Sequence, residues 1–141
     1  MSAESLAQLI ETAKTARLQS IAPFSNFLVG AAVKTKAGKV YTGCNVESAS
    51  YGLTVCAERV AIWKALSEGE RHFTELAIVA DTESLTPPCG TCRQIIHEFC
   101  KDDAIIILAN LRGETEECRM AELLPRAFDA RFLKAARDAA K

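Results

Sequence analysis

Two short, uniformly apolar runs separated by a helix-forming segment restrict the fold of this chain more than any other feature. The runs are "LAIVAD" (Leu76–Asp81) and "AIIILAN" (Ala104–Asn110), and the segment between them favours a helix from Cys89 to about Phe99. Strands that are apolar on both faces must be covered on both faces, which is typical of parallel strands in α/β proteins. We therefore predict that these runs are parallel neighbours in a sheet that lies between two layers of helices.

The segments before these runs predict a helix and a hairpin. Apolar residues at helical spacing indicate a first helix over residues 5–18, where Ser5 and Gln8 can form a capping box. The stretch "FLVGAAVKTKAGKVYTGCNV" then reads as two strands about a turn at Ala37 and Gly38. The hairpin adds antiparallel pairing, so the sheet is expected to be mixed.

A second helix is predicted from Cys56 to Glu68, with Gly69 as its C-terminal cap. The remainder of the chain predicts, in order, a turn at Gly113, a short edge strand "ECRM", a helical turn "AELLP" and a helix from Asp129 to Ala140. No repeat or polar linker divides the sequence, so we expect one domain over residues 1–141. The predicted fold is α/β, a three-layer α/β/α sandwich around a mixed five-stranded sheet.

Charge and hydropathy exclude several classes of partner. The chain has 17 Lys and Arg against 18 Asp and Glu, a net charge of -1, which provides no basic surface for nucleic acid. The N-terminal "MSAESLAQLIETAK" does not resemble a signal peptide, and the apolar runs are too short to cross a membrane. We expect a cytoplasmic protein that binds a small molecule.

The motif "PCGTC" places Cys89 and Cys92 three residues apart at the start of a predicted helix. A pair with this spacing is compatible with a redox dithiol, because a helix N-terminus lowers the pKa of a thiol. It is equally compatible with two ligands of a metal ion. The motif alone does not distinguish the two.

A second motif favours the metal site over the redox dithiol. Cys56 also begins a predicted helix, and Glu58 follows it at two residues. Three thiolates favour zinc, and three protein ligands leave the fourth tetrahedral position open, as in catalytic zinc sites. Residues i and i+2 lie on opposite sides of a regular helix, so Cys56 is expected at the cap or in the first turn. The pattern of Cys, Glu at two residues and then Pro-Cys-x-x-Cys is that of the zinc nucleobase deaminases.

The whole set of motifs resembles the small nucleoside cytidine deaminases, a family of homotetrameric zinc enzymes. The resemblance covers the chain from the first helix onward and rests on "PFSNFLVGAAV", "GCNVESASYG", "CAERVAIWKALSEG", "PCGTCRQ" and "ELLPRAF". The sequence departs from the family at three positions, where the family commonly has Tyr, Ser and Gly: Phe24, Pro87 and Arg126.

For the metal centre, the resemblance implies that Cys56, Cys89 and Cys92 bind Zn2+. It further implies that Glu58 carries protons between water and the base, and that Arg59 hydrogen-bonds the ligand sulfurs.

For the substrate, the resemblance implies that Asn45 and Glu47 bind the ribose and that Phe27 lines the pocket. The main chain of Ala57, together with that of Cys89, would read the pyrimidine. Phe128 would reach the base from a neighbouring subunit, so that active sites are shared within a homotetramer.

The implied function is zinc-dependent hydrolytic deamination of cytidine and deoxycytidine in pyrimidine salvage. An alternative within the family is a deaminase of a modified cytosine nucleoside such as blasticidin S, against which Glu47 argues. A thiol-disulfide protein and a non-catalytic zinc module are the alternatives from other classes. His72 and His97 are solitary in the sequence and are expected to have surface or local hydrogen-bonding roles.

Overall fold

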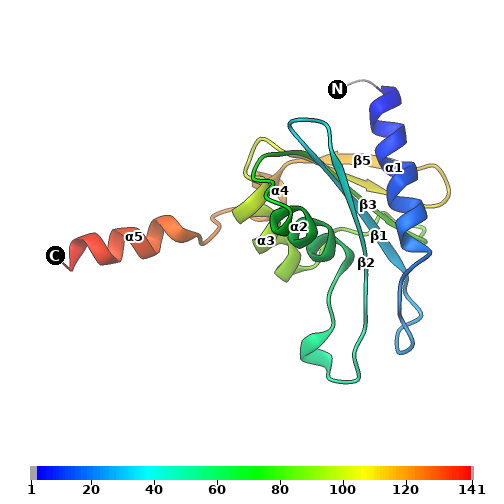
Figure 1. Cartoon of the computed structure of the whole chain (residues 1–141), viewed down its shortest axis with the longest axis horizontal. Coiled ribbons are helices and arrows are strands. Elements are labelled where there is room, and N and C mark those ends of the chain that lie inside the picture. Colours follow the sequence, from blue (N-terminus) through cyan, green and yellow to red (C-terminus); the bar gives the residue numbers. More distant parts are fainter. Residues whose placement is uncertain (1–2, 141) are drawn as a thin grey trace.

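The computed structural model describes residues 3–140 as a five-stranded sheet with helices on both faces (Figure 1). In chain order the elements are α1 (Ala3–Arg17), β1 (Val29–Thr35), β2 (Val40–Cys44), the short 3₁₀ helix η1 (Tyr51–Leu53), α2 (Ala57–Ser67), β3 (Phe73–Ala80), α3 (Gly90–Cys100), β4 (Ile105–Ala109), β5 (Thr115–Cys118), α4 (Met120–Leu123) and α5 (Ala130–Ala139).

The strand order across the sheet is β2-β1-β3-β4-β5. Strands β3 and β4, which contain the two apolar runs, are parallel, with Leu76 opposite Ile106 and Ile78 opposite Leu108. The other three pairings are antiparallel. The predicted mixed five-stranded sheet is therefore confirmed, including the parallel pairing of its two most apolar strands.

Alternate residues of β3 serve two separate cores. Ala77 and Val79 pack with Leu9 of α1 on one face of the sheet. Leu76 and Ile78 pack on the other face with residues of α2 and α3. Because side chains alternate across a strand, an unbroken apolar run is what a central strand between two helical layers requires. The predicted α/β/α sandwich is confirmed.

The predicted start of the first helix is wrong. Helix α1 begins at Ala3, so Ser5 lies inside it and cannot act as its N-cap. The Ser5 hydroxyl instead accepts a hydrogen bond of 2.7 Å from Lys34 Nζ on β1. With 15 residues α1 is the longest helix, and no helix within residues 3–140 combines the length and apolarity needed to cross a bilayer.

The hairpin turn is confirmed at Gly38, which has a φ of 93°. The predicted edge strand is displaced by two residues, because β5 runs from Thr115 to Cys118. Arg119 is extended and caps α4, and Met120 is already the first residue of that helix. The predicted strand "ECRM" was therefore wrong at its C-terminal end.

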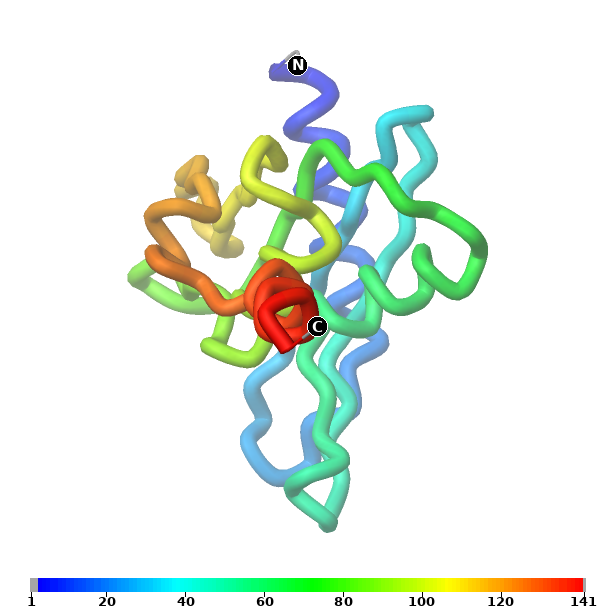
Figure 2. Tube along the Cα trace, turned by 90° about the vertical axis from the view of Figure 1, so that its left-hand side faces the viewer, coloured from blue at the N-terminus to red at the C-terminus, as the bar shows by residue number. Residues whose placement is uncertain are grey.

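The C-terminal helix α5 projects away from the sheet and its helical layers (Figure 1), and Figure 2 shows it nearly end-on. None of the residues of α5 is buried. At one end of the sheet, the segments around residues 20–27 and 46–55 extend together (Figures 1 and 2), joined by a bridge between Ile21 and Val46. The segments at the end of the sheet carry Phe27 and Glu47 of the expected substrate pocket, and Phe128 lies just before α5.

Helix α2 lies so close to the hairpin that only glycine fits at position 43. A Cβ atom added at Gly43 would lie 2.4 Å from the carbonyl oxygen of Ala57 and 2.5 Å from the amide nitrogen of Ala61. Both atoms belong to the backbone of α2 and cannot yield by a side-chain rotation. Gly43 therefore sets the depth at which the helix following Cys56 sits on the sheet.

Replacing Gly43 by Ala should force α2 away from β2. Overpacking of this kind costs about 1–3 kcal/mol, and we expect the free energy of unfolding measured in urea to fall by that amount. Gly52→Ala is the matched control, because an added Cβ there meets nothing within 4 Å. Equal stability of the Gly43→Ala and Gly52→Ala variants would contradict the close-packing assignment.

Candidate metal and active site

Three thiols from two helix starts meet at one point. Cys56 is the N-cap of α2 and Cys89 is the N-cap of α3, both with extended backbone. Cys92 lies in the first turn of α3 and is buried. The three sulfur atoms all lie within 4.8 Å of one another. Cys56 thus occupies the cap, as the spacing between Cys56 and Glu58 predicted.

The thiol cluster fits zinc. A tetrahedral ion with Zn–S bonds of ~2.3 Å holds its sulfur ligands about 3.8 Å apart, and Cys56 Sγ lies 3.6 Å from Cys89 Sγ. The N-termini of α2 and α3 each contribute roughly half a positive charge towards this point, which favours thiolates. The donor set is therefore suited to zinc with a fourth position left for another ligand.

The pKa values of Cys56 and Cys92 are shifted in opposite directions. A hydrogen bond from Cys92 is the main reason that the pKa of Cys56 is lowered to about 5, with a further contribution from Arg59. The same hydrogen bond and burial raise the pKa of Cys92. The lowered pKa of Cys56 favours its thiolate form, which is the form that binds a metal ion.

Arg59 lies against the thiol cluster. Its Nη2 atom is 3.5 Å from Cys56 Sγ, and its guanidinium carbon is 5.8 Å from the ring centre of Trp63, one helical turn further along α2. Among residues 3–140, Arg59 Nε is the buried side-chain nitrogen without a hydrogen-bond partner. The guanidinium is held between a sulfur and an aromatic face, where its charge offsets that of the thiolates.

Glu58 is a buried carboxyl group beside the thiols, with 3% of its surface exposed. Burial raises its pKa to about 7, and the nearby Cys56 thiolate adds to that effect. A carboxyl group that titrates near neutral pH can accept and return a proton with little cost in either direction. Its position and pKa suit a proton carrier.

Asn45 joins the first protruding loop to the sheet. Its Oδ1 accepts a hydrogen bond of 2.8 Å from Val29 N, and its Nδ2 donates one of 2.7 Å to the carbonyl oxygen of Phe27. The next residue, Val46, forms a bridge with Val55, immediately before Cys56. The expected ribose-binding segment is therefore placed beside the start of α2, where Ala57 is fully buried.

Glu47 is fixed by contacts that the sequence did not indicate. Its carboxylate accepts hydrogen bonds from Phe24 N at 2.9 Å and Ser25 N at 3.1 Å, and another from the Ser25 hydroxyl. The Ser25 hydroxyl bond in particular lowers the pKa of Glu47. Ser25 Oγ also accepts from Phe27 N at 3.0 Å, so one serine orients two of the expected substrate-binding residues.

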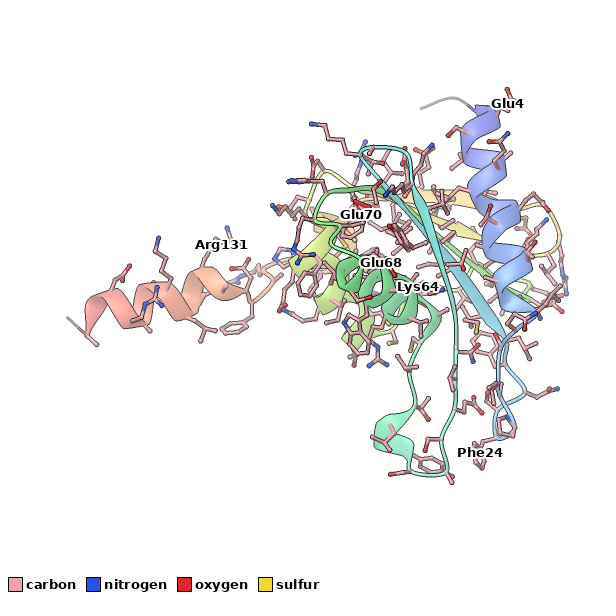
Figure 3. All side chains as sticks on the ribbon, viewed as in Figure 1. Glu4, Phe24, Lys64, Glu68, Glu70 and Arg131 are labelled. Atoms are coloured by element: carbon pink, nitrogen blue, oxygen red, sulfur yellow. The ribbon has the colours of Figure 1, made fainter. Side chains whose placement is uncertain are left out.

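A hollow of about 240 Å³ beside Glu47 is also lined by Phe24, Tyr51 and Thr54. Phe24 and Tyr51 meet edge to face, with ring centres 6.2 Å apart. Figure 3 shows Phe24 at the tip of this protruding region. Hydrogen bonds through Ser25 and the Phe27 carbonyl group connect Phe27, Asn45 and Glu47 to one another.

Phe128 is attached to a different part of the molecule. Its carbonyl oxygen accepts a hydrogen bond of 2.8 Å from Gln94 on α3, and its ring stacks on Phe132 of α5 at 5.7 Å. The side chain is largely exposed, at 57%. Within one chain, Phe128 therefore contacts α3 and α5 at the outer surface.

A mixed sheet between helices, with three thiols and a buried carboxyl group at two helix starts, defines the zinc-dependent deaminases as the class of this site. Residues 3–109 match the family model described as "Cytidine and deoxycytidylate deaminase zinc-binding region". The chain belongs to this family.

Curated relatives agree with this assignment. The chain is 50% identical to a cytidine deaminase of Sporosarcina psychrophila over 121 residues, which cover 86% of this chain and 89% of that protein. It is 29% identical to a blasticidin-S deaminase of Bacillus cereus over 126 residues, covering 84% of this chain and 88% of the relative. The similarity to the cytidine deaminase is thus much the greater of the two.

Solved structures show the same fold. A crystal structure of cytidine deaminase from Burkholderia pseudomallei superimposes with a TM-score of 0.85 at 46% identity, covering 91% of this chain and 100% of that one. Cytidine deaminase from Mycobacterium tuberculosis gives a TM-score of 0.77 at 37% identity, covering 88% of this chain and 97% of that one. The redox-dithiol interpretation of Cys89 and Cys92 is therefore set aside.

Removal of the metal should change which cysteines react. In the zinc-loaded protein we expect Cys56 and Cys89 to resist iodoacetamide at neutral pH, and a strong chelator should make both reactive because thiolates are the attacking species. Cys100, whose pKa burial raises to about 12, should stay unmodified until the protein unfolds. Peptide mass spectrometry would detect each adduct, and alkylation of Cys56 at the same rate with and without the chelator would refute the ligand assignment.

Proposed function

We propose that this protein catalyses the hydrolytic deamination of cytidine and deoxycytidine to uridine and deoxyuridine, with release of ammonia. The observation that carries the proposal is the buried Glu58, with a pKa raised to about 7, beside three thiols that can hold zinc and leave one position open. The 50% identity to a cytidine deaminase supports the choice of substrate.

Cys56, Cys89 and Cys92 would hold the zinc ion, which when bound lowers the pKa of water from ~15.7 towards ~7. Glu58 would accept a proton from the attacking water and deliver it to N3 of the pyrimidine ring. After hydroxide adds at C4, Glu58 would take the remaining proton of the C4 hydroxyl group and pass it to the amino group, so that the C4–N bond breaks and ammonia leaves. The balance is one water consumed, one ammonia released and a carbonyl formed at C4.

Binding of the nucleoside would use Phe27, Asn45 and Glu47. Asn45 and Glu47 would hydrogen-bond the sugar hydroxyls, while Phe27 packs against the nucleoside. The main chain of Ala57 and Cys89 would contact the base. The carboxylate of Glu47 stays ionised because its pKa is lowered, and it would repel a phosphate nearby, so free nucleosides are the expected substrates.

We also propose that the enzyme works as a homotetramer in cytoplasmic pyrimidine salvage. Phe128 would complete the pocket of a neighbouring copy, since its ring is exposed at the outer surface of its own chain. A reducing compartment suits a site built from three thiols.

Glu58→Gln should abolish most of the turnover while the zinc remains bound. The amide keeps the size and polarity of the side chain but cannot carry a proton, so we expect kcat to fall by roughly two to four orders of magnitude. Metal analysis of the same preparation provides the control. Turnover close to that of the parent protein would exclude Glu58 as the proton carrier.

A panel of nucleosides should separate the proposed reaction from its nearest alternative. We expect ultraviolet absorbance to report turnover of cytidine and deoxycytidine, with no measurable turnover of cytidine monophosphate. Blasticidin S should react far more slowly than either nucleoside. Inactivity on both cytidine and deoxycytidine in a zinc-loaded preparation would eliminate the proposal, and faster turnover of blasticidin S would favour the alternative.

A further inference from the structure

Three side chains on one face of α3 hold the segment that carries Phe128. Arg93 Nη1 donates a hydrogen bond of 2.8 Å to the carbonyl oxygen of Leu123, at the end of α4. Gln94 Nε2 donates one of the same length to the carbonyl oxygen of Phe128. His97 Nε2 lies 2.9 Å from Asp129 Oδ2. We call Arg93, Gln94 and His97 the α3 clamp.

Asp129, the partner of His97, is also the residue at which α5 begins. Asp129 is the N-cap of α5, with Oδ1 accepting a hydrogen bond of 3.0 Å from Arg131 N. The Arg131 guanidinium pairs with the same carboxylate at 2.7 Å, at the junction labelled in Figure 3. The side chains of His97 and Asp129 are only 11% and 14% exposed. His97 thus binds a carboxylate that is itself fixed to the first turn of α5.

Apart from Leu124, which packs against the hydrophobic core, the linker between α4 and Asp129 lies outside the regular structure of the domain. Residues 124–128 form no helix or strand, and none of the residues of α5 beyond them is buried. Arg126 has a φ of 55°, in the left-handed region. This conformation is unfavourable for a residue with a Cβ, so contacts at the two ends of the linker help to impose its path. The α3 clamp supplies contacts at both ends.

The clamp connects this path to the metal centre. Helix α3 begins next to Cys89 and contains Cys92, and Arg93 Nε also donates a hydrogen bond of 2.8 Å to the carbonyl oxygen of Pro88. Helix α3, which positions Cys89 and Cys92, therefore also holds the backbone at Phe128. The sequence predicted a surface or local hydrogen-bonding role for His97, whereas its bond to Asp129 joins residues 32 positions apart.

We propose that His97, through Asp129, is a positioning residue that sets the orientation of Phe128 and thereby the KM for the nucleoside. The proposal rests on the proposed function, in which Phe128 completes the pocket of another copy of this chain. His97 itself does not touch the substrate. Its loss should weaken substrate binding while the proton-transfer machinery around Glu58 remains intact.

The test is a double-mutant cycle on the zinc-loaded, full-length enzyme. His97→Leu should raise KM for cytidine roughly tenfold, the loss expected for one hydrogen bond to a charged group, with kcat and zinc content nearly unchanged. In a Phe128→Ala background, the same change should leave KM unaltered. His97→Gln, whose amide can still donate to Asp129, should restore most of the affinity. His72→Leu, the same change at the other histidine of the chain, is the matched control.

Each other outcome is decisive. If Phe128→Ala raises KM but His97→Leu does not, the clamp has no positioning role and the proposed function stands. If His97→Leu raises KM equally with and without the Phe128 ring, it acts by another route and the inference fails. If Phe128→Ala leaves KM unchanged, the shared pocket and the clamp inference both fail, whereas the result for Glu58→Gln is unaffected. If the His97→Leu variant does not fold, Asp129→Ala removes the same contact by deleting its carboxylate.

Discussion

The architecture depends on bringing the N-termini of α2 and α3 together so that three sulfur atoms can share one cation. Thiolates at these distances repel one another, and the two helix starts, Arg59 and a bound divalent ion offset that repulsion. The rest of the fold meets this requirement: glycine at position 43 lets α2 approach the hairpin closely, and the parallel pair β3 and β4 places α3 beside it. Burial at the same point raises the pKa of Glu58 to about 7.

Much of the fold was predictable because it follows from local patterns. Uniform apolarity in Leu76–Asp81 and Ala104–Asn110 indicated central parallel strands, and these runs form β3 and β4. Errors arose where local signals compete. The hydroxyl of Ser5 looked like a helix cap but bonds Lys34, and the run "ECRM" looked like a strand although Met120 is buried in α4. A sequence pattern does not reveal which tertiary partner a polar side chain finds.

The same distinction applies to the site. The thiols and Glu58 were predictable because their spacing at two helix starts leaves few geometries for three ligands and a carboxyl group. The contacts of Ser25 with Glu47 and of His97 with Asp129 were not, because each joins residues more than twenty positions apart and neither forms part of a spacing pattern. Such contacts orient the residues that a motif identifies, and here they determine how Glu47 and Phe128 are presented.

The position of Trp63 has an optical consequence. It is the single tryptophan of the chain, its indole is 46% exposed, and its ring lies against the Arg59 guanidinium, which in turn contacts Cys56. A change in charge at the sulfur is therefore transmitted through one side chain to the fluorophore. The fluorescence of Trp63 is therefore expected to respond to the state of the metal centre, and it can be followed without a label or a coupled assay.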